Sequence, residues 1–177
     1  MSLNIKLFKL GFIGLIVMSV AVVAILSTAY LIYSPQLPPV DTLKDVKLQT
    51  PLKVYSREGK LIALFGEKRR IPLSYQELPQ TMVDAFLAAE DDRFFEHPGV
   101  DYQGLLRAVI NLVITGQKAQ GGSTITMQLA RNFFLTPERT YTRKIKEIML
   151  ALRIEKELTK QEILELYLNK IYLGQRA

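Results

Sequence analysis

The 177-residue sequence contains no cysteine and only one histidine, His97. The absence of cysteine excludes disulfides and thiolate metal sites, and a single imidazole excludes a metal centre with several histidine ligands. Any metal ion would need carboxylate oxygens, which suit Mg²⁺ or a similar hard cation. The motifs Ser-x-x-Lys, G-x-S-x-G and the P-loop are also missing. The sequence therefore shows no apparatus for acyl transfer by an activated serine.

Negative charge is scarcer than positive charge in this chain. Lys and Arg together number 23 and Asp and Glu 17, which leaves a net charge of +6. A modest basic excess indicates an anionic partner, and a nucleic acid, a membrane surface or a phosphate ester would each fit.

Charge is missing altogether between Lys9 and Asp41. Within this gap Leu10–Tyr33 is nearly all apolar, and as a helix it would extend about 36 Å, enough to cross a bilayer core of about 30 Å. Lys6 and Lys9 precede it, which predicts a cytoplasmic N-terminus and an extracytoplasmic remainder. The alternative is a cleaved signal peptide, whose apolar region is usually only ~7–15 residues long. An extracytoplasmic domain argues against a nucleic-acid partner.

The chain is expected to divide into four parts: a cytoplasmic tail at 1–9, a transmembrane helix at 10–33, a linker at 34–50 and one domain at 51–177. The stretch SPQLPPV has three prolines, which end the helix and begin an extended linker. LKVYSREGKLIALFG then predicts two short strands around a turn at Arg57–Lys60, with an irregular loop as the alternative.

Two helices are expected in the first half of the domain. Pro79 suits a first helical turn, and the apolar spacing continues from it to Glu90. A second helix is predicted over Tyr102–Thr115, with Asp101 as N-cap and Gly116 as the stop. The spacing predicts that its inward positions are Leu105, Leu106, Val109, Ile110 and Val113.

Two further helices are expected after a polar loop at 116–123. One is predicted to start at Thr136-Pro137, and the other to start at a capping box, Thr159–Glu162, and to end at Gly174. The predicted buried stripe of the first of these consists of Ile145, Ile148, Met149 and Leu152. The fold class is therefore mainly α, with a small β element at the start of the domain.

The stretch EDDRFFEHPG concentrates carboxylates at the end of an apolar helix. Glu90 stands at the negative pole of the helix dipole, Asp91 and Asp92 add like charge, and the two phenylalanines that follow would exclude water. All three effects disfavour an ionised carboxylate, and a carboxylate tuned in this way suits a general base. The alternative is an ordinary acidic helix end. His97 would orient a carboxylate, bind substrate or simply complete the loop.

A cluster of cations occurs in RTYTRKIKE. Arg139, Arg143 and Glu147 are four residues apart and would share one helix face, with Lys146 one turn from Arg143. A row of cationic side chains that ends in a carboxylate would hold a diphosphate, and Glu147 would position a cation or a metal ion. The alternative is a solvated helix, on which such pairs are common.

The stretch GGSTITMQLARN places two glycines and two hydroxyl side chains before a helix. The glycines permit close backbone approach, and free N–H groups at the helix N-terminus would face an anion. Arg131 adds a cation at the far end. The alternative is an ordinary N-cap after a loop.

Taken together and in order, four stretches resemble the motifs of one family. EDDRFFEHPG is similar to its first motif, GGSTITMQLARN to the second, RKIKE (Arg143–Glu147) to the third and KQEILELYLN (Lys160–Asn169) to the fourth. This is the peptidoglycan glycosyltransferase family (glycosyltransferase family 51) of class A penicillin-binding proteins. The resemblance implies a lysozyme-like, mainly α fold with a membrane-embedded jaw region.

The resemblance also implies roles for individual residues. Glu90 falls on the family's general base, which deprotonates the 4-hydroxyl of the acceptor sugar. Glu147 falls on the second essential carboxylate, associated with the diphosphate of the donor. The diphosphate-contacting cations of the family fall on Arg131, Arg139, Arg143 and Lys144. The positions that shape the cleft fall on Asp91, Phe94, His97, Ser123, Thr124 and Gln128.

The activity that the resemblance implies is the polymerisation of lipid II, a disaccharide-peptide on undecaprenyl diphosphate, into β-1,4-linked glycan strands for the bacterial cell wall. The implied cofactor is a divalent cation, Mg²⁺ or Mn²⁺. The implied partners are the growing glycan chain, membrane lipid and other cell wall synthesis proteins, and no nucleic acid. The inhibitor moenomycin binds the same cleft in the family. The implied location is the cytoplasmic membrane, with a single pass and the catalytic domain in the periplasm.

Two departures from the family pattern carry expectations of their own. Met127 stands where many members have glutamine, which predicts one polar contact fewer in the cleft. Members continue beyond the position of Ala177 with further helices, a fifth motif and a transpeptidase domain. The sequence is therefore expected to hold a C-terminally truncated glycosyltransferase domain. Its cleft and its activity are expected to be incomplete, and it is expected not to bind penicillin.

Two other functions compete with this one. A lysozyme-like lytic hydrolase also uses a glutamate, but it leaves the cluster of Arg139, Arg143 and Lys144 without a purpose. A non-catalytic, membrane-anchored interaction module would bind partner proteins through its acidic and basic runs. Its binding would not depend on Glu90 or Glu147.

Overall fold

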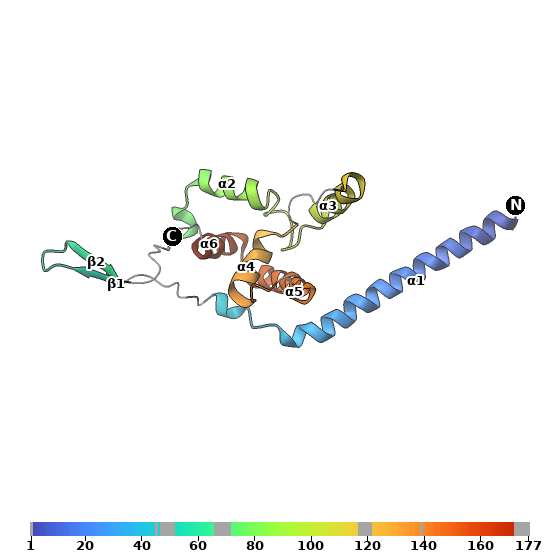
Figure 1. Ribbon diagram of the computed structural model, residues 1–177, viewed down its shortest axis with the longest axis horizontal. Helices are drawn as coiled ribbons and strands as arrows, with labels where there is room; N and C mark the ends of the chain where they lie inside the picture. The colour runs from blue at the N-terminus through green and yellow to red at the C-terminus, as the bar shows by residue number, and fades with distance from the viewer. Residues whose placement is uncertain are drawn as a thin grey trace. The chain divides into compact units, whose positions relative to one another are not determined.

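The computed structural model describes residues 2–44, 46, 52–65, 72–116, 122–138 and 140–171. The chain forms two compact units, Met1–Pro38 and Pro39–Ala177. Helices make up most of the described chain, and the only strands within it form one two-stranded sheet (Figure 1). The predicted fold class, mainly α with a small β element behind an apolar N-terminal helix, is confirmed.

The first unit consists almost entirely of one helix, α1 (Ser2–Tyr33). Within the described residues, Gly11–Gln36 is the one helical stretch long and apolar enough to cross a membrane, with a mean hydropathy of 2.5. The helix begins well before the apolar segment because the residues around Lys6 and Lys9 also suit a helix. Hydropathy therefore marks the apolar part of α1 and not its first residue.

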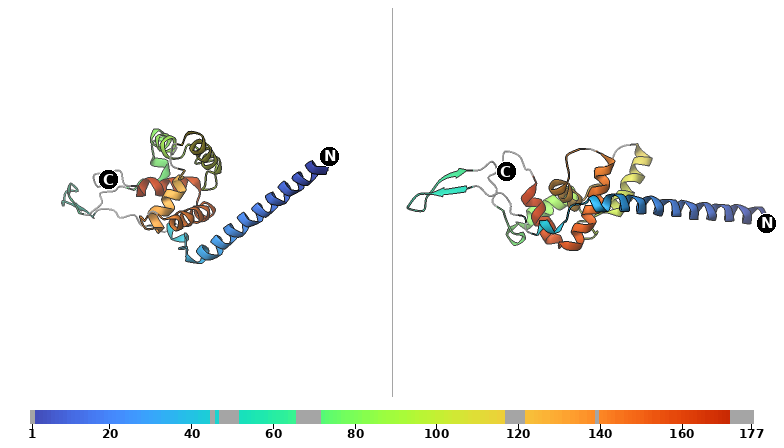
Figure 2. Two further views of the ribbon diagram at one scale, coloured as in Figure 1. Left: turned by 45° about the vertical axis from the view of Figure 1, so that its right-hand side comes forward. Right: turned by 90° about the horizontal axis from the view of Figure 1, so that it is seen from below.

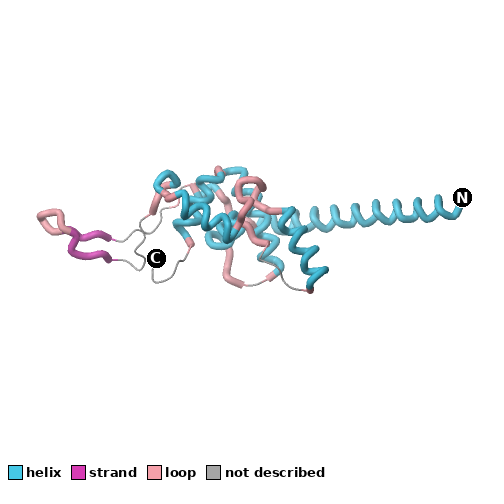
Figure 3. The backbone as a smooth tube through the Cα atoms, turned by 90° about the horizontal axis from the view of Figure 1, so that it is seen from above, coloured by secondary structure: helices cyan, strands magenta, loops and turns pink. Residues whose placement is uncertain are grey.

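The second unit contains the expected β-hairpin after a short 3-10 helix at Asp41–Leu43, so the alternative of an irregular loop is wrong. Strand β1 (Leu52–Tyr55) pairs antiparallel with β2 (Leu61–Phe65), and Leu52 lies opposite Phe65. Gly59 takes a left-handed conformation with φ +78° in the turn, where glycine is the least strained residue. Figure 3 shows the two strands as a separate ribbon.

Five α-helices follow in the described part of the chain. They are α2 (Gln80–Glu90), α3 (Tyr102–Thr115), α4 (Ile125–Phe134), α5 (Tyr141–Glu157) and α6 (Lys160–Lys170). The predicted N-caps of α3 and α6 are confirmed: Asp101 Oδ1 accepts from Gly104 N at 2.9 Å, and Thr159 and Glu162 form the capping box. The predicted starting point of α5 is wrong, because Thr140 caps it in place of Thr136. The predicted end of α6 is also wrong, because the helix ends at Lys170.

The core of the second unit lies around α4, which packs against both α5 and α6 (Figure 2). Eleven apolar side chains from the three helices are buried, all but one at 3% exposure or less: Ile125, Met127, Leu129, Ala130, Leu150, Ala151, Ile154, Ile163, Leu164, Tyr167 and Leu168. Gly99 lets the loop after α2 approach α5 closely. It has φ +93°, and a Cβ there would lie 2.9 Å from the carbonyl oxygen of Ala151. The loop that follows Glu90 is thereby held against the core.

The buried face of α5 is displaced from the predicted one. Glu147, Leu150, Ala151 and Ile154 are the buried residues, whereas the four predicted positions are only half-buried. Glu147 was not among the predicted inward positions, yet it lies inside the fold with cationic partners.

Helix α3 also differs from the prediction. Leu106, Ile110 and Val113 were expected to face inward, yet their exposed fractions are 62%, 47% and 79%. Leu105 is half-buried and packs against the small cluster of Val100, Met127 and Ala151. The side chain of Val109 lies outside the described residues. Helix α3 therefore presents an apolar face that the described chain does not cover.

The capping box of α6 should make stability depend on pH. The backbone N–H and the hydroxyl of Thr159 donate to Glu162 at 2.7 and 2.8 Å and lower the pKa of its carboxyl. This stabilisation is complete above about pH 4.5, the ordinary value for this carboxyl, and is lost as pH falls through the lower folded value. Glu162→Gln should therefore flatten the acid side of the stability–pH curve, measured by denaturant unfolding. Glu58→Gln, in the hairpin turn, is the control, and equal acid slopes for wild type and Glu162→Gln would contradict the assignment.

Candidate active site

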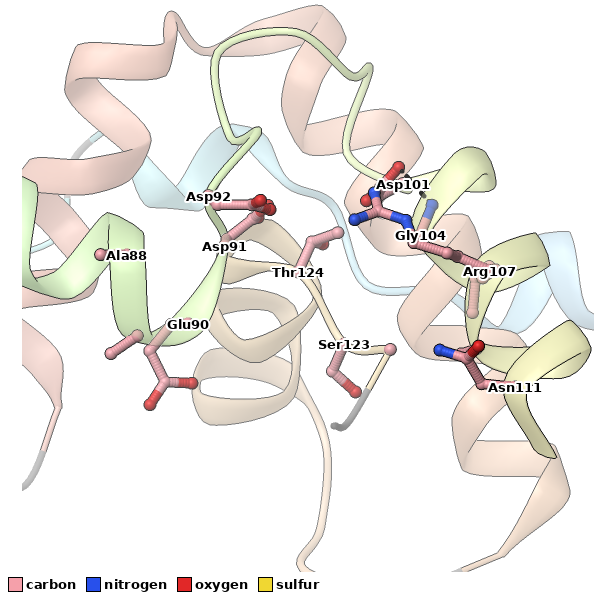
Figure 4. Close-up of a pocket in the computed structure, with 14 residues that line it drawn as sticks. Ala88, Glu90, Asp91, Asp92, Asp101, Gly104, Arg107, Asn111, Ser123 and Thr124 are labelled. Carbon is pink, nitrogen blue, oxygen red and sulfur yellow. Dashed lines mark hydrogen bonds between the residues drawn. The ribbon is translucent and has the colours of Figure 1, made fainter. Parts of the chain in front are cut away.

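A cavity of about 390 Å³ lies between the end of α2, helix α3 and the segment that leads into α4 (Figure 4). Most of its wall comes from residues with small or polar side chains. They are Ala88, Ala89, Glu90, Asp91 and Asp92 from the α2 side, Asp101, Gly104, Leu105, Arg107, Ala108 and Asn111 from the α3 side, and Gly122, Ser123 and Thr124 between them. This cavity brings the first and second motifs of the sequence together.

Glu90 is the last residue of α2 and lines the cavity, as its predicted position at a helix end requires. The expectation of a water-poor corner is wrong, because Glu90 is exposed. Phe94 is fully buried, with its ring 6.3 Å from that of His97, and Phe95 is 52% exposed. The ring of Phe94 therefore packs beneath the site, and the ring of Phe95 lies outside it.

The orientation of Glu90 is set by a short chain of hydrogen bonds. Gln128 Nε2 donates to Glu90 Oε2 at 2.8 Å, and the hydroxyl of Tyr167 donates to Gln128 Oε1 at 3.3 Å. The tyrosine thus directs the amide so that its N–H₂ group faces the carboxylate. Burial and the nearby Glu90 carboxylate raise the pKa of Tyr167 to about 12, so its hydroxyl remains a donor at neutral pH.

Asp91 holds the two motifs together beneath the cavity. Its carboxylate oxygens lie 2.9 and 3.0 Å from His97 Nε2, and Asp91 Oδ2 accepts from the backbone N–H of Ile125 at 3.0 Å. Thr124 accepts from Met127 N and donates to the carbonyl of Gly99 at 2.6 Å. The expected anion site at the N-terminus of α4 is therefore already occupied in part by a side chain of the protein.

Glu147 is the centre of a second cluster. It is 1% exposed, and both Arg143 Nη1 and Lys144 contact it, the Lys144 Nζ at 3.2 Å from Oε2. Lys144 Nζ also donates to Ser123 Oγ at 2.6 Å. The prediction that Arg139 shares a helix face with Arg143 and Glu147 stays a prediction. Arg139 lies outside the described residues and precedes the first residue of α5.

The charge of this cluster is unevenly balanced. Burial and the neighbouring cations Arg143 and Arg131 lower the pKa of Lys144. The buried carboxylate of this cluster, Glu147, pairs with both Arg143 and Lys144. Three cations therefore gather around one buried carboxylate, and an anion placed among them would relieve the excess positive charge.

The two predicted catalytic carboxylates do not share one cavity wall. Glu90 lines the cavity, whereas Glu147 lies behind it and reaches it only through Lys144 and Ser123. Of the other predicted residues, Asp91, Ser123 and Thr124 line the cavity, Gln128 contacts Glu90, and Phe94 and His97 lie beneath it. The roles of all these residues in substrate binding stay predictions.

Met127 lies in the core and not in the cleft. It is 1% exposed and packs with Val100 and Ala151. The expectation that a methionine here removes a polar contact from the cleft is therefore wrong, since its side chain does not line the cavity.

The described residues do not build a cage for a metal ion. No group of three His, Asp or Glu side chains in the described ranges has the spacing that such a cage needs. Asp91 is engaged by His97, and Glu147 by two cations. The described residues therefore do not fit a divalent cation held by the protein alone.

Three residues near the site were missed by the sequence argument. Tyr167 was given no role, because nothing in the spacing distinguishes its hydroxyl from a solvated one. Arg107 and Asn111 line the cavity from α3. Their signal was present in the sequence, because Gly104, Arg107, Ala108 and Asn111 form a small and polar stripe at helical spacing on an otherwise apolar helix.

The fold and the site together define a helical domain, preceded by an apolar helix, in which carboxylates line one cavity and a cluster of cations lies behind it. The chain matches the sequence model of a family described as Transglycosylase over residues 58–177, and it belongs to this family.

Similar proteins agree with this assignment. The chain is 62% identical over 148 residues to Penicillin-binding protein 1A of Escherichia coli (strain K12), a match that covers 84% of the chain and 17% of that protein. It is 59% identical over 151 residues to Penicillin-binding protein 1A of Pseudomonas aeruginosa (85% and 18%) and 56% identical over 148 residues to that of Vibrio cholerae (84% and 18%). The chain thus spans less than a fifth of the length of these three relatives.

Proposed function

We propose that this chain is the peptidoglycan glycosyltransferase part of a cell wall synthase, which polymerises lipid II into β-1,4-linked glycan strands and releases undecaprenyl diphosphate. The observation that carries the proposal is the membership of the transglycosylase family together with a cavity lined by Glu90 and by Ser123, the hydrogen-bond partner of Lys144. The relatives named above are penicillin-binding proteins, which agrees with a role in the cell wall.

The reaction needs a base for a weak nucleophile. The hydroxyl of the acceptor sugar must lose its proton as it attacks, and a carboxylate within hydrogen-bond reach can accept it. Glu90 is exposed to the cavity and is held by Gln128, so its free oxygen is available to a sugar hydroxyl. Attack on an α-linked donor to give a β-1,4 bond is one inversion, which fits a single base and no covalent intermediate.

The leaving group needs neutralisation more than protonation, because a diphosphate carries its own negative charge. Lys144, which donates to Ser123 at the cavity, provides positive charge together with its neighbours Arg143 and Arg131 behind the cavity wall, and we assign Arg139 to the same group. A divalent cation, Mg²⁺ or Mn²⁺, would be bound by the diphosphate oxygens of the substrate. Moenomycin, a mimic of the phosphate-bearing substrate, is expected to compete for this cluster.

A membrane location suits a polyprenyl substrate. Helix α1 fits a single-pass anchor, and we propose that its N-terminus is cytoplasmic because Lys6 and Lys9 precede the apolar part. The exposed apolar residues of α3, among them Leu106 and Val113, agree with a jaw region that dips into the outer leaflet. The domain would then meet its substrate where the head group leaves the membrane, together with other cell wall synthesis proteins.

The test is the fate of two substrates, measured with the full-length protein that contains this sequence. A glycosyltransferase should convert labelled lipid II into long glycan strands, sensitive to moenomycin, and leave finished glycan intact. A lytic hydrolase would release muropeptides from finished glycan and ignore lipid II. Binding of partner proteins without turnover of either substrate would favour the interaction module and refute the proposal.

A further inference from the structure

The α3 side of the cavity has no assigned role, although its chemistry is distinctive. Arg107 and Asn111 stand one helical turn apart on α3, and Gly104 and Ala108 on the same stripe leave space beside them. A solvated amphipathic helix would turn its polar stripe to bulk water. Here Arg107 and Asn111 line a cavity although both are exposed, and the apolar Leu106, Ile110 and Val113 of the same helix are exposed as well.

Opposite charges face each other across this cavity without meeting. Figure 4 shows Asp92, at the end of α2, and Arg107, on α3, extending into the space between the two helices from opposite sides. Neither side chain makes a hydrogen bond or an ion pair with any residue in the described ranges, and the same holds for the side-chain amide of Asn111. By contrast, Asp91 and Asp101, in the same wall, are paired with His97 and Arg93.

The charges of the wall decide which kind of ligand fits between these groups. Four carboxylates line the cavity, those of Glu90, Asp91, Asp92 and Asp101, against the single guanidinium of Arg107. A phosphate would be repelled by this wall and has a better site at Lys144 and Arg143. A neutral sugar can donate its hydroxyls to Asp92 and Glu90 and accept from Arg107 and Asn111. The volume of about 390 Å³ lies in the usual range for small-molecule sites, about 300–1,000 Å³.

We propose that Asp92, Arg107 and Asn111 form a sugar-binding subsite that holds the acceptor sugar against Glu90. This inference rests on the proposed function and makes it more specific. The hydroxyls next to the one that Glu90 deprotonates are held by Asp92 from one side and by Arg107 and Asn111 from the other. Arg107 therefore binds a neutral ring and does not belong to the diphosphate cluster.

The experiment compares Arg107→Ala, Asp92→Asn and Asn111→Ala with Arg57→Ala in the full-length protein that contains this sequence. Arg57, in the hairpin turn, is an exposed arginine outside the cavity. Each subsite variant should raise the KM for lipid II about tenfold, as expected for the loss of a charge-assisted or amide hydrogen bond to substrate, and change kcat less. The midpoint of thermal unfolding should stay at the wild-type value, and Arg57→Ala should behave as wild type.

A binding measurement separates this inference from the proposed function. Saturation-transfer NMR with N,N′-diacetylchitobiose, a soluble β-1,4-linked amino sugar, should give a signal with wild type and Arg57→Ala that the three subsite variants lose. A sugar signal without lipid II turnover would leave the subsite standing and refute the proposed function. Equal signals and equal KM values in all variants, no signal with wild type, or displacement of the sugar by inorganic diphosphate would each overturn the subsite.

Discussion

Replacing Glu90 by glutamine should lower the rate of lipid II polymerisation by about 10²–10⁴-fold, the usual contribution of a general base. Glutamine retains the size of the side chain and can still meet the amide of Gln128, so the end of α2 should keep its conformation. What it loses is the ability to take a proton from the acceptor hydroxyl. The loss should appear in kcat, with little change in the KM for lipid II.

The measurement is strand formation from labelled lipid II by the full-length protein that contains this sequence. Glu96→Gln is the matched control, since Glu96 is an exposed carboxylate in the loop that follows Asp91 and does not line the cavity. Full polymerisation by Glu90→Gln would remove Glu90 as the base. A loss of similar size in Glu96→Gln would show that the effect is electrostatic and not specific to one position.

The parts of the fold that the sequence predicted well depend on local chemistry. The hairpin follows from alternating residues around a glycine turn, and the caps at Asp101 and Thr159 follow from side chains that bond to their own helix. Errors at helix ends have the same origin. Thr136 and Thr140 are equivalent N-cap signals, and only the packing of α5 on α4 selects the second.

The predictions that failed required knowledge of the surroundings of a helix. Apolar spacing on α3 identified one face correctly, but spacing does not tell whether a face meets a core or stays uncovered, as Leu106 and Val113 do. In α5 the apolar spacing did not include Glu147 among the buried positions, whereas pairing with Arg143 and Lys144 allows this carboxylate to be buried.

The candidate site shows a similar division. Motifs located Glu90, Asp91 and Ser123 at one cavity because each sits at the end of an element, where the chain must turn inward. They did not predict that Phe94 would leave Glu90 exposed, since the direction of a ring depends on the tertiary contacts of the loop. The link from Tyr167 to Glu90 joins helices distant in the sequence, and no local pattern encodes it.

Replacing Glu147 by glutamine should have the largest effect on stability. The carboxylate is 1% exposed and pairs with Arg143 and Lys144, and removing one partner of a buried ion pair typically costs about 3–5 kcal/mol of unfolding free energy. The loss leaves two adjacent cations and Arg131 without a counter-charge, and burial and these neighbours already lower the pKa of Lys144. Polymerisation should fall as well, because the displaced cations no longer face Ser123 and the leaving diphosphate.

The control for this prediction lies on the same helix. Glu157, in the last turn of α5, pairs with Lys44 at 3.0 Å, but both side chains are about half exposed, with 43% and 50% of their surface accessible. Exposed pairs contribute only about 0–1 kcal/mol, so Glu157→Gln should unfold almost as wild type does in denaturant. If Glu147→Gln is no less stable than Glu157→Gln, the carboxylate is not the electrostatic centre of its cluster. If it is less stable while lipid II turnover is unchanged, the cations do not serve the leaving diphosphate.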